Sequence, residues 1–138
     1  MRCTIVAQSN VDFIWSSVEH FIKAAYTKHI GDETDTDVLE NLRLGKYQLW
    51  IAHNGRGIIA AAVTRLATLP NGRRICFAMA CGGQGFDEWA HQGISEIEKF
   101  AKSNKCDAVR LSGRRGWRAY KKYGYKEPFV FLEKALNV

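Results

Sequence analysis

The sequence is poor in proline and has no long hydrophobic run, and both absences narrow the class of protein. With 2 proline and 12 glycine residues among 138, it is neither collagen-like nor a linker. The uncharged apolar stretches, such as Gly57 to Thr64, are far shorter than the roughly 20 residues of a membrane-spanning helix. The first ten residues have no basic region followed by an apolar core. We therefore expect no secretory signal and a cytoplasmic location.

The cysteine and histidine residues also lack the spacing that is typical of metal-binding sites. The cysteines Cys3, Cys76, Cys81 and Cys106 form no C-x-x-C pair, and the 4 histidines are scattered. We therefore expect no metal site. The cysteines are expected to act as small buried apolar residues in a reducing compartment.

The composition that remains is that of a globular protein. Hydrophobic residues make up 46% of the chain and charged residues 25%. A chain of this length builds one hydrophobic core and needs no disulfide or metal to fold. The prediction is a single domain over residues 1–138.

The excess positive charge is concentrated in one segment. The net charge is +6, and residues Arg114 to Lys126 contain six basic residues and no acidic one, which leaves 14 of each sign elsewhere. Four aromatic residues are interspersed among them. The segment fits an anionic partner such as a phosphate, a nucleic acid or an acidic protein surface. It also fits a solvated helix face.

Hydrophobic periodicity and turn residues predict ten elements. Strands are expected at Cys3–Ala7, Tyr47–Ala52, Gly57–Leu69, Arg74–Cys81, Ala108–Leu111 and Phe129–Leu132. Helices are expected from Val11 to a stop at Gly31, from Asp35 or Thr36 to about Leu44, from Phe86 to about Lys105, and from Trp117 to Tyr123. Asn71-Gly72 favours a type I′ turn between the third and fourth strands.

The late strand-helix-strand step sets part of the topology. Such a step favours a right-handed crossover, and hence a parallel pair inside a mixed sheet. It also puts the Gly-rich turn Cys81 to Phe86 at the start of a helix. Backbone N–H groups and the helix dipole can hold an anion there. A Gly-rich loop is also simply a common turn.

This order of elements, together with two motifs, resembles the GNAT superfamily of N-acetyltransferases. The first motif is the segment Arg118 to Glu127, in which Tyr120 stands four residues before Gly124-Tyr125. The resemblance implies an α+β fold in which a central mixed, mostly antiparallel sheet of about six strands is flanked by about four helices. It also implies that Tyr120 is the catalytic acid that protonates the leaving thiolate of coenzyme A. A packing role for its ring is the alternative.

The second motif is the Gly-rich turn, which resembles the coenzyme A loop of the family without its spacing. The resemblance implies acetyl-CoA as cofactor. The residues implied to bind it are Met79, Cys81, Gly83, Gln84, Gly85, Phe86 and Arg114. The loop amides would hold the pyrophosphate, the strand end would pair with the pantetheine arm, and Arg114 or Arg115 would neutralise the 3′-phosphate. Asp87 and Glu88 follow directly, and carboxylates there repel an anion.

The general base has no obvious candidate. In the family it is often a Glu on the central strands, whereas Gly57 to Cys81 contains no acidic residue. Glu33, Asp35 and Asp37 lie in the segment that shapes the acceptor site in the family. They are the remaining side-chain candidates for the base, and a solvated acidic loop is the alternative. Water as the base, or an amine that arrives already deprotonated, would make a side-chain base unnecessary.

Two functions are therefore predicted. The first is an acyl-CoA-dependent N-acyltransferase that moves an acetyl group to an amine of a small molecule or a protein. The second is a non-catalytic module. The closing pattern contains Gly113-Arg114-Arg115-Gly116-Trp117, Tyr123-Gly124-Tyr125 and Leu132 to Leu136. This pattern resembles small phage-encoded GNAT-like proteins with degenerate cofactor loops. That resemblance implies a virion or accessory protein in the host cytoplasm or the virion. Its residues Arg114 to Lys126 would bind nucleic acid or other virion proteins.

Overall fold

The computed structural model describes residues 1–27, 33–112 and 115–136. Within these ranges the elements follow one another as β1 (Arg2–Val6), η1 (Gln8–Asn10), α1 (Val11–Thr27), α2 (Asp35–Arg43), β2 (Tyr47–Asn54), β3 (Gly57–Thr68), β4 (Arg74–Gly83), α3 (Phe86–Ser103), β5 (Ala108–Leu111) and η2 (Arg115–Tyr123). The labels η1 and η2 denote 3-10 helices.

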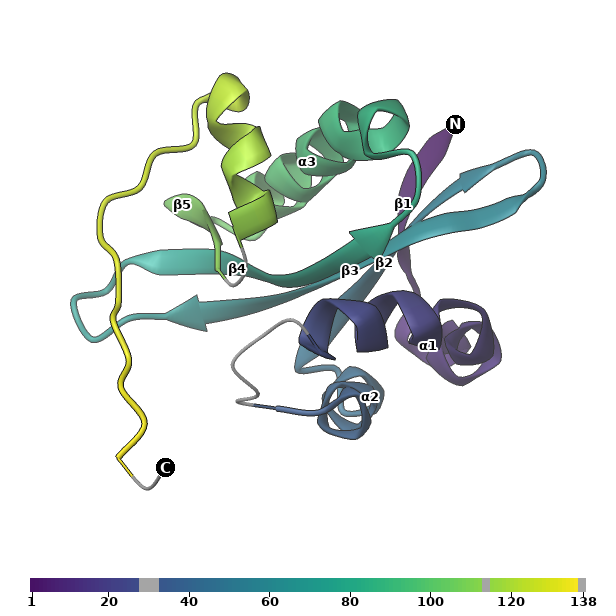
Figure 1. Ribbon diagram of the computed structural model, residues 1–138, viewed down its shortest axis with the longest axis horizontal. Helices are drawn as coiled ribbons and strands as arrows, with labels where there is room; N and C mark the ends of the chain where they lie inside the picture. The colour runs from purple at the N-terminus through teal and green to yellow at the C-terminus, as the bar shows by residue number, and fades with distance from the viewer. Residues whose placement is uncertain (28–32, 113–114, 137–138) are drawn as a thin grey trace.

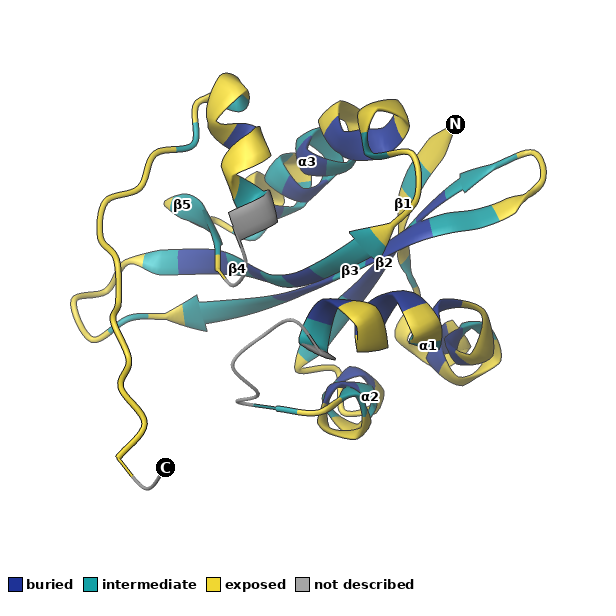
Figure 2. Ribbon diagram, viewed as in Figure 1, coloured by how far each residue is buried: buried dark blue, intermediate teal, exposed yellow. Residues whose placement is uncertain are grey.

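The strands form one sheet in the order β1-β2-β3-β4-β5. Neighbouring strands are antiparallel except β4 and β5, which are parallel as the strand-helix-strand step predicted. Helices α1 and α2 cover one face, and α3 and η2 cover the other (Figure 1). Buried residues lie along the middle of the sheet and on the helix sides that face it (Figure 2). The α+β fold with a mixed, mostly antiparallel sheet is thereby confirmed. Among the described helices, none has the length and apolarity to cross a bilayer.

The expected sixth strand is wrong. Residues Phe129 to Leu132 belong to no strand and are exposed, so the sheet described here has five strands. The β-prone composition of this segment is real, but a strand also needs a neighbour whose backbone it can pair with.

Three local predictions also need correction. The turn before β4 is not type I′, because that turn needs a positive φ at Asn71, and only Gly72 has one. The N–H of Gly72 donates to the carbonyl of Leu69, as in a three-residue hairpin loop. Helix α2 is capped by Thr34 rather than by Asp35 or Thr36, in a reciprocal capping box with Asp37. The expected helix Trp117–Tyr123 is a 3-10 helix, and the expected stop at Gly31 lies outside the described residues.

Helix α1 packs closely against the end of β4. A Cβ atom at Gly82 would overlap the carbonyl oxygen of Phe21 in α1, and one at Gly83 would overlap Ala60 in β3. Packing alone therefore accounts for glycine at these two positions, independently of any ligand. They allow a helix backbone and a strand backbone to approach more closely than side chains would permit.

Replacing Gly82 with alanine should therefore destabilise the fold. We expect Gly82→Ala to lower the free energy of unfolding by about 1–3 kcal/mol, the usual cost of overpacking. Gly55→Ala is the matched control, because its Cβ would meet nothing within 4 Å. Urea unfolding followed by circular dichroism measures both. Equal midpoints for the two variants would contradict the close approach.

Candidate active site

A cavity opens where the two parallel strands part. Pairing of β4 with β5 runs from Ile75 opposite Ala108 to Ala78 opposite Leu111, and the N–H of Ser112 still donates to the carbonyl of Ala78 at 3.1 Å. Strand β4 then continues to Gly83 beside β3. The cavity beside this continuation measures about 180 Å³, and its walls come from α1, β4, α3 and η2.

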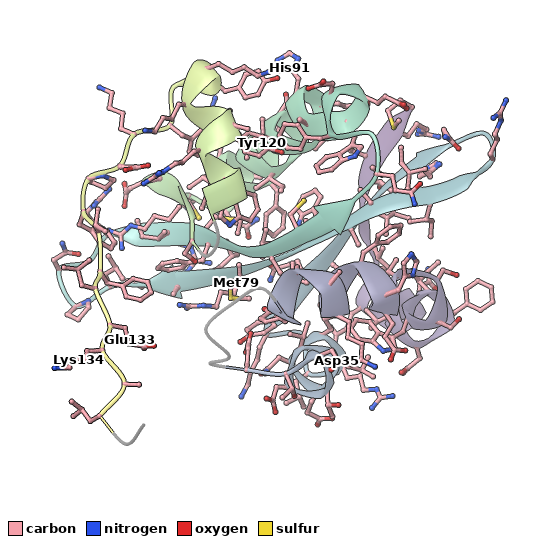
Figure 3. All side chains as sticks on the ribbon, viewed as in Figure 1. Asp35, Met79, His91, Tyr120, Glu133 and Lys134 are labelled. Atoms are coloured by element: carbon pink, nitrogen blue, oxygen red, sulfur yellow. The ribbon has the colours of Figure 1, made fainter. Side chains whose placement is uncertain are left out.

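Strand β4 contains a bulge at the cavity. Val63 of β3 lies opposite Ala80 and Thr64 opposite Ala78, so Met79 is an extra residue between the two pairs. A bulge leaves the extra residue outside the regular ladder and re-aims its backbone groups, and bulges are frequent next to active sites. Figure 3 shows Met79 on the α1 side of the sheet and Tyr120 on the other side. Because both residues line the cavity, it extends around the edge of β4 where, among the described residues, the pairing with β5 has ended.

Tyr120 of η2 is buried, with 3% of its surface exposed. Its ring packs edge-on against Phe86, with 5.5 Å between ring centroids, and also contacts Trp117, Tyr123 and Tyr125. Burial, followed by the proximity of Cys81, raises the pKa of its hydroxyl above the usual range. Within the described residues this hydroxyl has no hydrogen-bond partner, although buried hydroxyls nearly always have one. A buried phenol hydroxyl that lines a cavity is placed to bond a ligand there.

Most of the residues predicted for the site lie together. Met79, Cys81, Gly83 and Phe86 line the cavity with Tyr120. Gln84 and Gly85 are outside its wall and exposed, and Arg114 lies outside the described residues. The residues that sequence reasoning missed are Ala25, Tyr26, Ala80, Gly82, Trp89 and Trp117. Tyr26 ends the apolar stripe of α1, and its position in that stripe is the one signal that could have suggested it.

The Gly-rich turn is only partly free to bind an anion. The N–H of Gln84 donates to the carbonyl of Ile59 at 2.9 Å. The carbonyl of Gln84 accepts a hydrogen bond from Nε1 of Trp89 at 2.7 Å. Gly85 adopts a left-handed conformation (φ 63°) and begins α3, where no side chain caps the first backbone N–H groups. The carboxylate of Glu88, however, lies beside Gly85, 3.0 Å from where a Cβ atom would stand. The helix start is therefore uncapped but faces a negative charge.

A carboxylate stands behind the α1 wall of the cavity. Glu33 accepts hydrogen bonds from the hydroxyl of Tyr26 at 3.0 Å and from that of Tyr47 at 2.9 Å. Burial and the bond to Glu33 raise the pKa of Tyr47 to about 12, and burial and the charge of Glu33 raise that of Tyr26 above its usual range. Asp37 is engaged in the α2 cap. Of the three acidic candidates, Glu33 is thus the one tied to a cavity residue.

The basic segment is partly neutralised and partly packed inward. Glu127 forms ion pairs with Arg118 and Lys121. The four aromatic rings of the segment pack against one another and against α3. This favours a packing role for the aromatics, including Trp117, whose Nε1 donates to the carbonyl of Ser112 at 2.8 Å. Across the described ranges, no three metal-ligating side chains come together.

No known family model and no curated protein matches the sequence of this chain. Solved structures, in contrast, match its fold over the whole length. A predicted acetyltransferase from Clostridium acetobutylicum, solved with acetyl-CoA, has a TM-score of 0.70 at 16% identity and covers 97% of this chain and 95% of its own. A ribosomal-protein-alanine N-acetyltransferase from Brucella melitensis biovar Abortus 2308 has a TM-score of 0.71 at 11% identity, with 99% and 100% covered.

A third similar structure is an aminoglycoside acetyltransferase from an uncultured soil metagenomic sample, solved in complex with sisomicin. Its TM-score is 0.67 at 9% identity, with 99% of this chain and 96% of that chain covered. At such identities the likeness is one of fold. The chain has the GNAT acetyltransferase fold. The phage-like subgroup stays a prediction from the sequence.

Proposed function

We propose that this protein is an N-acetyltransferase that moves the acetyl group of acetyl-CoA to an amine. The observation that carries the proposal is the hydroxyl of Tyr120, which is buried, has no partner among the described residues, and lines the cavity at the parting of β4 and β5. A phenol that stays protonated and is held in place by packing on several sides can donate a hydrogen bond, and then its proton, to a departing anion.

The cavity residues supply the chemistry as follows. The nitrogen lone pair of the neutral amine attacks the thioester carbonyl carbon, and the carbon–sulfur bond breaks. Tyr120 donates its phenolic proton to the departing sulfur, and the proton released by the new amide returns the phenol to its neutral form through water. The backbone at the Met79 bulge hydrogen-bonds the carbonyl oxygen as negative charge develops there. Holding the two substrates together supplies several kcal/mol more, on the order of 7 or above for well-oriented reactants.

The cofactor fits the acyl end of this site better than the phosphate end. The edge of β4 beyond Ala78 is available to an extended pantetheine arm, and the uncapped start of α3 to the pyrophosphate. The carboxylate of Glu88 beside Gly85 opposes that negative charge. Binding of acetyl-CoA is therefore expected to be weaker than it would be at a helix start with no carboxylate beside it.

Glu33 is proposed to hold the acceptor amine. Its two tyrosine partners fix its carboxylate beside the cavity, and no cationic side chain of the described residues forms an ion pair with it. A carboxylate that is held by neutral hydroxyls and carries no ion pair with a described side chain attracts a protonated amine and accepts its proton before the attack. The similar structures include acetyltransferases named for an aminoglycoside and for a ribosomal-protein alanine, so they leave the acceptor class open.

The first test combines cofactor binding with removal of the Tyr120 hydroxyl. Calorimetric titration should detect acetyl-CoA binding, and a screen of amines should give turnover. Tyr120→Phe should then lower kcat by about 100-fold or more while leaving the Kd of acetyl-CoA unchanged. Tyr123→Phe, on the same helix but outside the cavity wall, is the matched control. A Tyr120→Phe enzyme of normal kcat would remove the residue from the mechanism.

The second test concerns the phosphate end. Glu88→Gln removes the charge beside Gly85, and we expect acetyl-CoA to bind about 3- to 10-fold more tightly, with a larger gain at low salt. Glu96→Gln, farther along α3, serves as the control and should change the Kd little. Equal effects of the two substitutions would show that the pyrophosphate does not approach the helix start.

The third test concerns the acceptor. Glu33→Gln keeps the size of the side chain but loses its charge, and it should raise the KM for the amine about tenfold without changing the Kd of acetyl-CoA. Asp35→Asn, on a neighbouring half-buried carboxylate, is the control. An unchanged amine KM in Glu33→Gln would place the acceptor elsewhere.

The alternative of a non-catalytic binding module has less support. Ion pairing of Arg118 and Lys121 with Glu127, and the inward packing of the aromatic rings, reduce what Arg114 to Lys126 offers to an anionic partner. Complete absence of acetyl-CoA binding at millimolar concentration would overturn the enzyme proposal. It would also redirect the search to macromolecular partners of this segment.

A further inference from the structure

The strands of the sheet carry positive charges and no negative ones. Strands β1 to β5 contain no Asp or Glu, and their arginines are Arg2, Arg65, Arg74 and Arg110. The guanidinium of Arg74 donates a hydrogen bond to the carbonyl of Asn104 at 2.8 Å. Among the described residues, neither Arg65 nor Arg110 forms an ion pair. These two half-buried charges are therefore the ones that an external anion could neutralise.

Arg65 and Arg110 belong to one row of residues that crosses four strands. From β2 to β5, the residues that lie opposite one another are Tyr47, Arg65, Phe77 and Arg110. Alternation along β3 places Arg65 on the same face as Val63, two residues before it. Val63 belongs to the core under α1. The row therefore lies on the face of the sheet that α1 and α2 partly cover.

The two guanidinium groups share one aromatic ring. The Cζ atom of Arg65 lies 4.2 Å from the centroid of the Phe77 ring, and the Cζ atom of Arg110 lies 5.7 Å from it. The ring of Phe129 is a second contact of Arg110, at 5.9 Å. Contact with a ring face holds a guanidinium in place and leaves the donors at its edge available to an oxyanion. Two positive charges at one ring repel each other, and an oxyanion between them replaces that repulsion with charge-assisted hydrogen bonds.

The row connects these charges to the carboxylate that is proposed to hold the amine. The hydroxyl of Tyr47, at the β2 end of the row, donates to Glu33 at 2.9 Å. Burial and Glu33 raise the pKa of Tyr47, and the positive charge of Arg65 opposes this rise, so the guanidinium lies near the phenol. On β4, Met79 follows Phe77 by two residues and lines the cavity from the α1 side (Figure 3). One face of the sheet thus presents a carboxylate and two guanidinium groups beside the cavity.

We propose that Arg65 and Arg110 bind an oxyanion of the acceptor, either a carboxylate or a phosphate. The substrate class is then an amine that also carries a negative charge. This inference rests on the proposed N-acetyltransferase function. Such an acceptor matches the row at both ends, because its ammonium group pairs with Glu33 and its oxyanion with the arginines. An acceptor with several positive charges and no negative one would be repelled by the two guanidinium groups.

Matched pairs of acceptors test the substrate class. Each pair is an ω-amino acid and its amide, and the chain length is varied to cover different separations of the two charges. Phosphoethanolamine and ethanolamine form a further pair that separates phosphate from carboxylate. We expect kcat/KM to be about tenfold higher or more for the anionic member of at least one pair, and this preference should shrink as salt is added. Turnover with equal kcat/KM in every pair would overturn the anion site and leave N-acetyl transfer intact.

Substitution of both arginines tests the residues. The double variant Arg65→Gln/Arg110→Gln should lose the preference while keeping the kcat/KM of the neutral amines. The double variant Arg65→Lys/Arg110→Lys keeps the charge without the planar fork and should retain part of the preference, which a purely structural role would not predict. Arg56→Gln, on an exposed arginine in the turn between β2 and β3, is the matched control and should behave as the wild type. A glutamine double variant that keeps the full preference overturns the proposal.

Calorimetric titration separates the anion site from catalysis. The anionic member of each pair is titrated into the wild-type protein and the glutamine double variant, with and without coenzyme A. The wild-type protein should bind at least one of them about tenfold more tightly than the variant does. Such binding without any turnover would support the anion site and count against N-acetyl transfer. Equal binding by the two proteins in all titrations would overturn the anion site, whatever the activity.

Discussion

The end of the β4–β5 pairing is the constraint on which the site depends. Parallel strands that stayed paired to the end would leave no free edge, and the cavity would close. The separation is maintained from both sides of the sheet. On one face α1 rests on Gly82, and on the other Tyr120 packs against Phe86. The bulge at Met79 lies between these two contacts and interrupts the ladder with β3. Packing within the chain thus gives the opening its shape.

The glycines of the turn have separate physical roles. Gly82 and Gly83 permit close approach of backbone to backbone, whereas Gly85 provides the left-handed residue from which α3 begins. A sequence motif read as a single phosphate-binding loop therefore combines two packing positions with one helix start.

The sequence predicted most of the fold, because helical periodicity and β-branched runs are local signals. The elements of the sheet up to β5 were predicted to within a few residues, and the parallel pair followed from handedness. The failures concern non-local partners. Phe129–Leu132 has the composition of a strand but no neighbouring strand. The type I′ turn at Asn71 was predicted from a residue pair alone, whereas the length of the hairpin loop determines the turn type. For the site, Tyr120 was proposed through a motif. Tyr26 and Trp89 stand in the apolar stripes of their helices, but tertiary packing, which no local pattern contains, decides that both reach the cavity.

The cavity joins residues that are far apart along the chain, from Ala25 in α1 to Tyr120 in η2. Its wall is therefore complete only after the first helix and the last one have docked on opposite faces of the sheet. A partly folded chain has no such wall, so any molecule that occupies the cavity stabilises the fully folded state alone. Thermal denaturation then becomes a general reporter of occupancy: a compound that fills this space raises the midpoint, whatever its chemistry and whether or not it reacts.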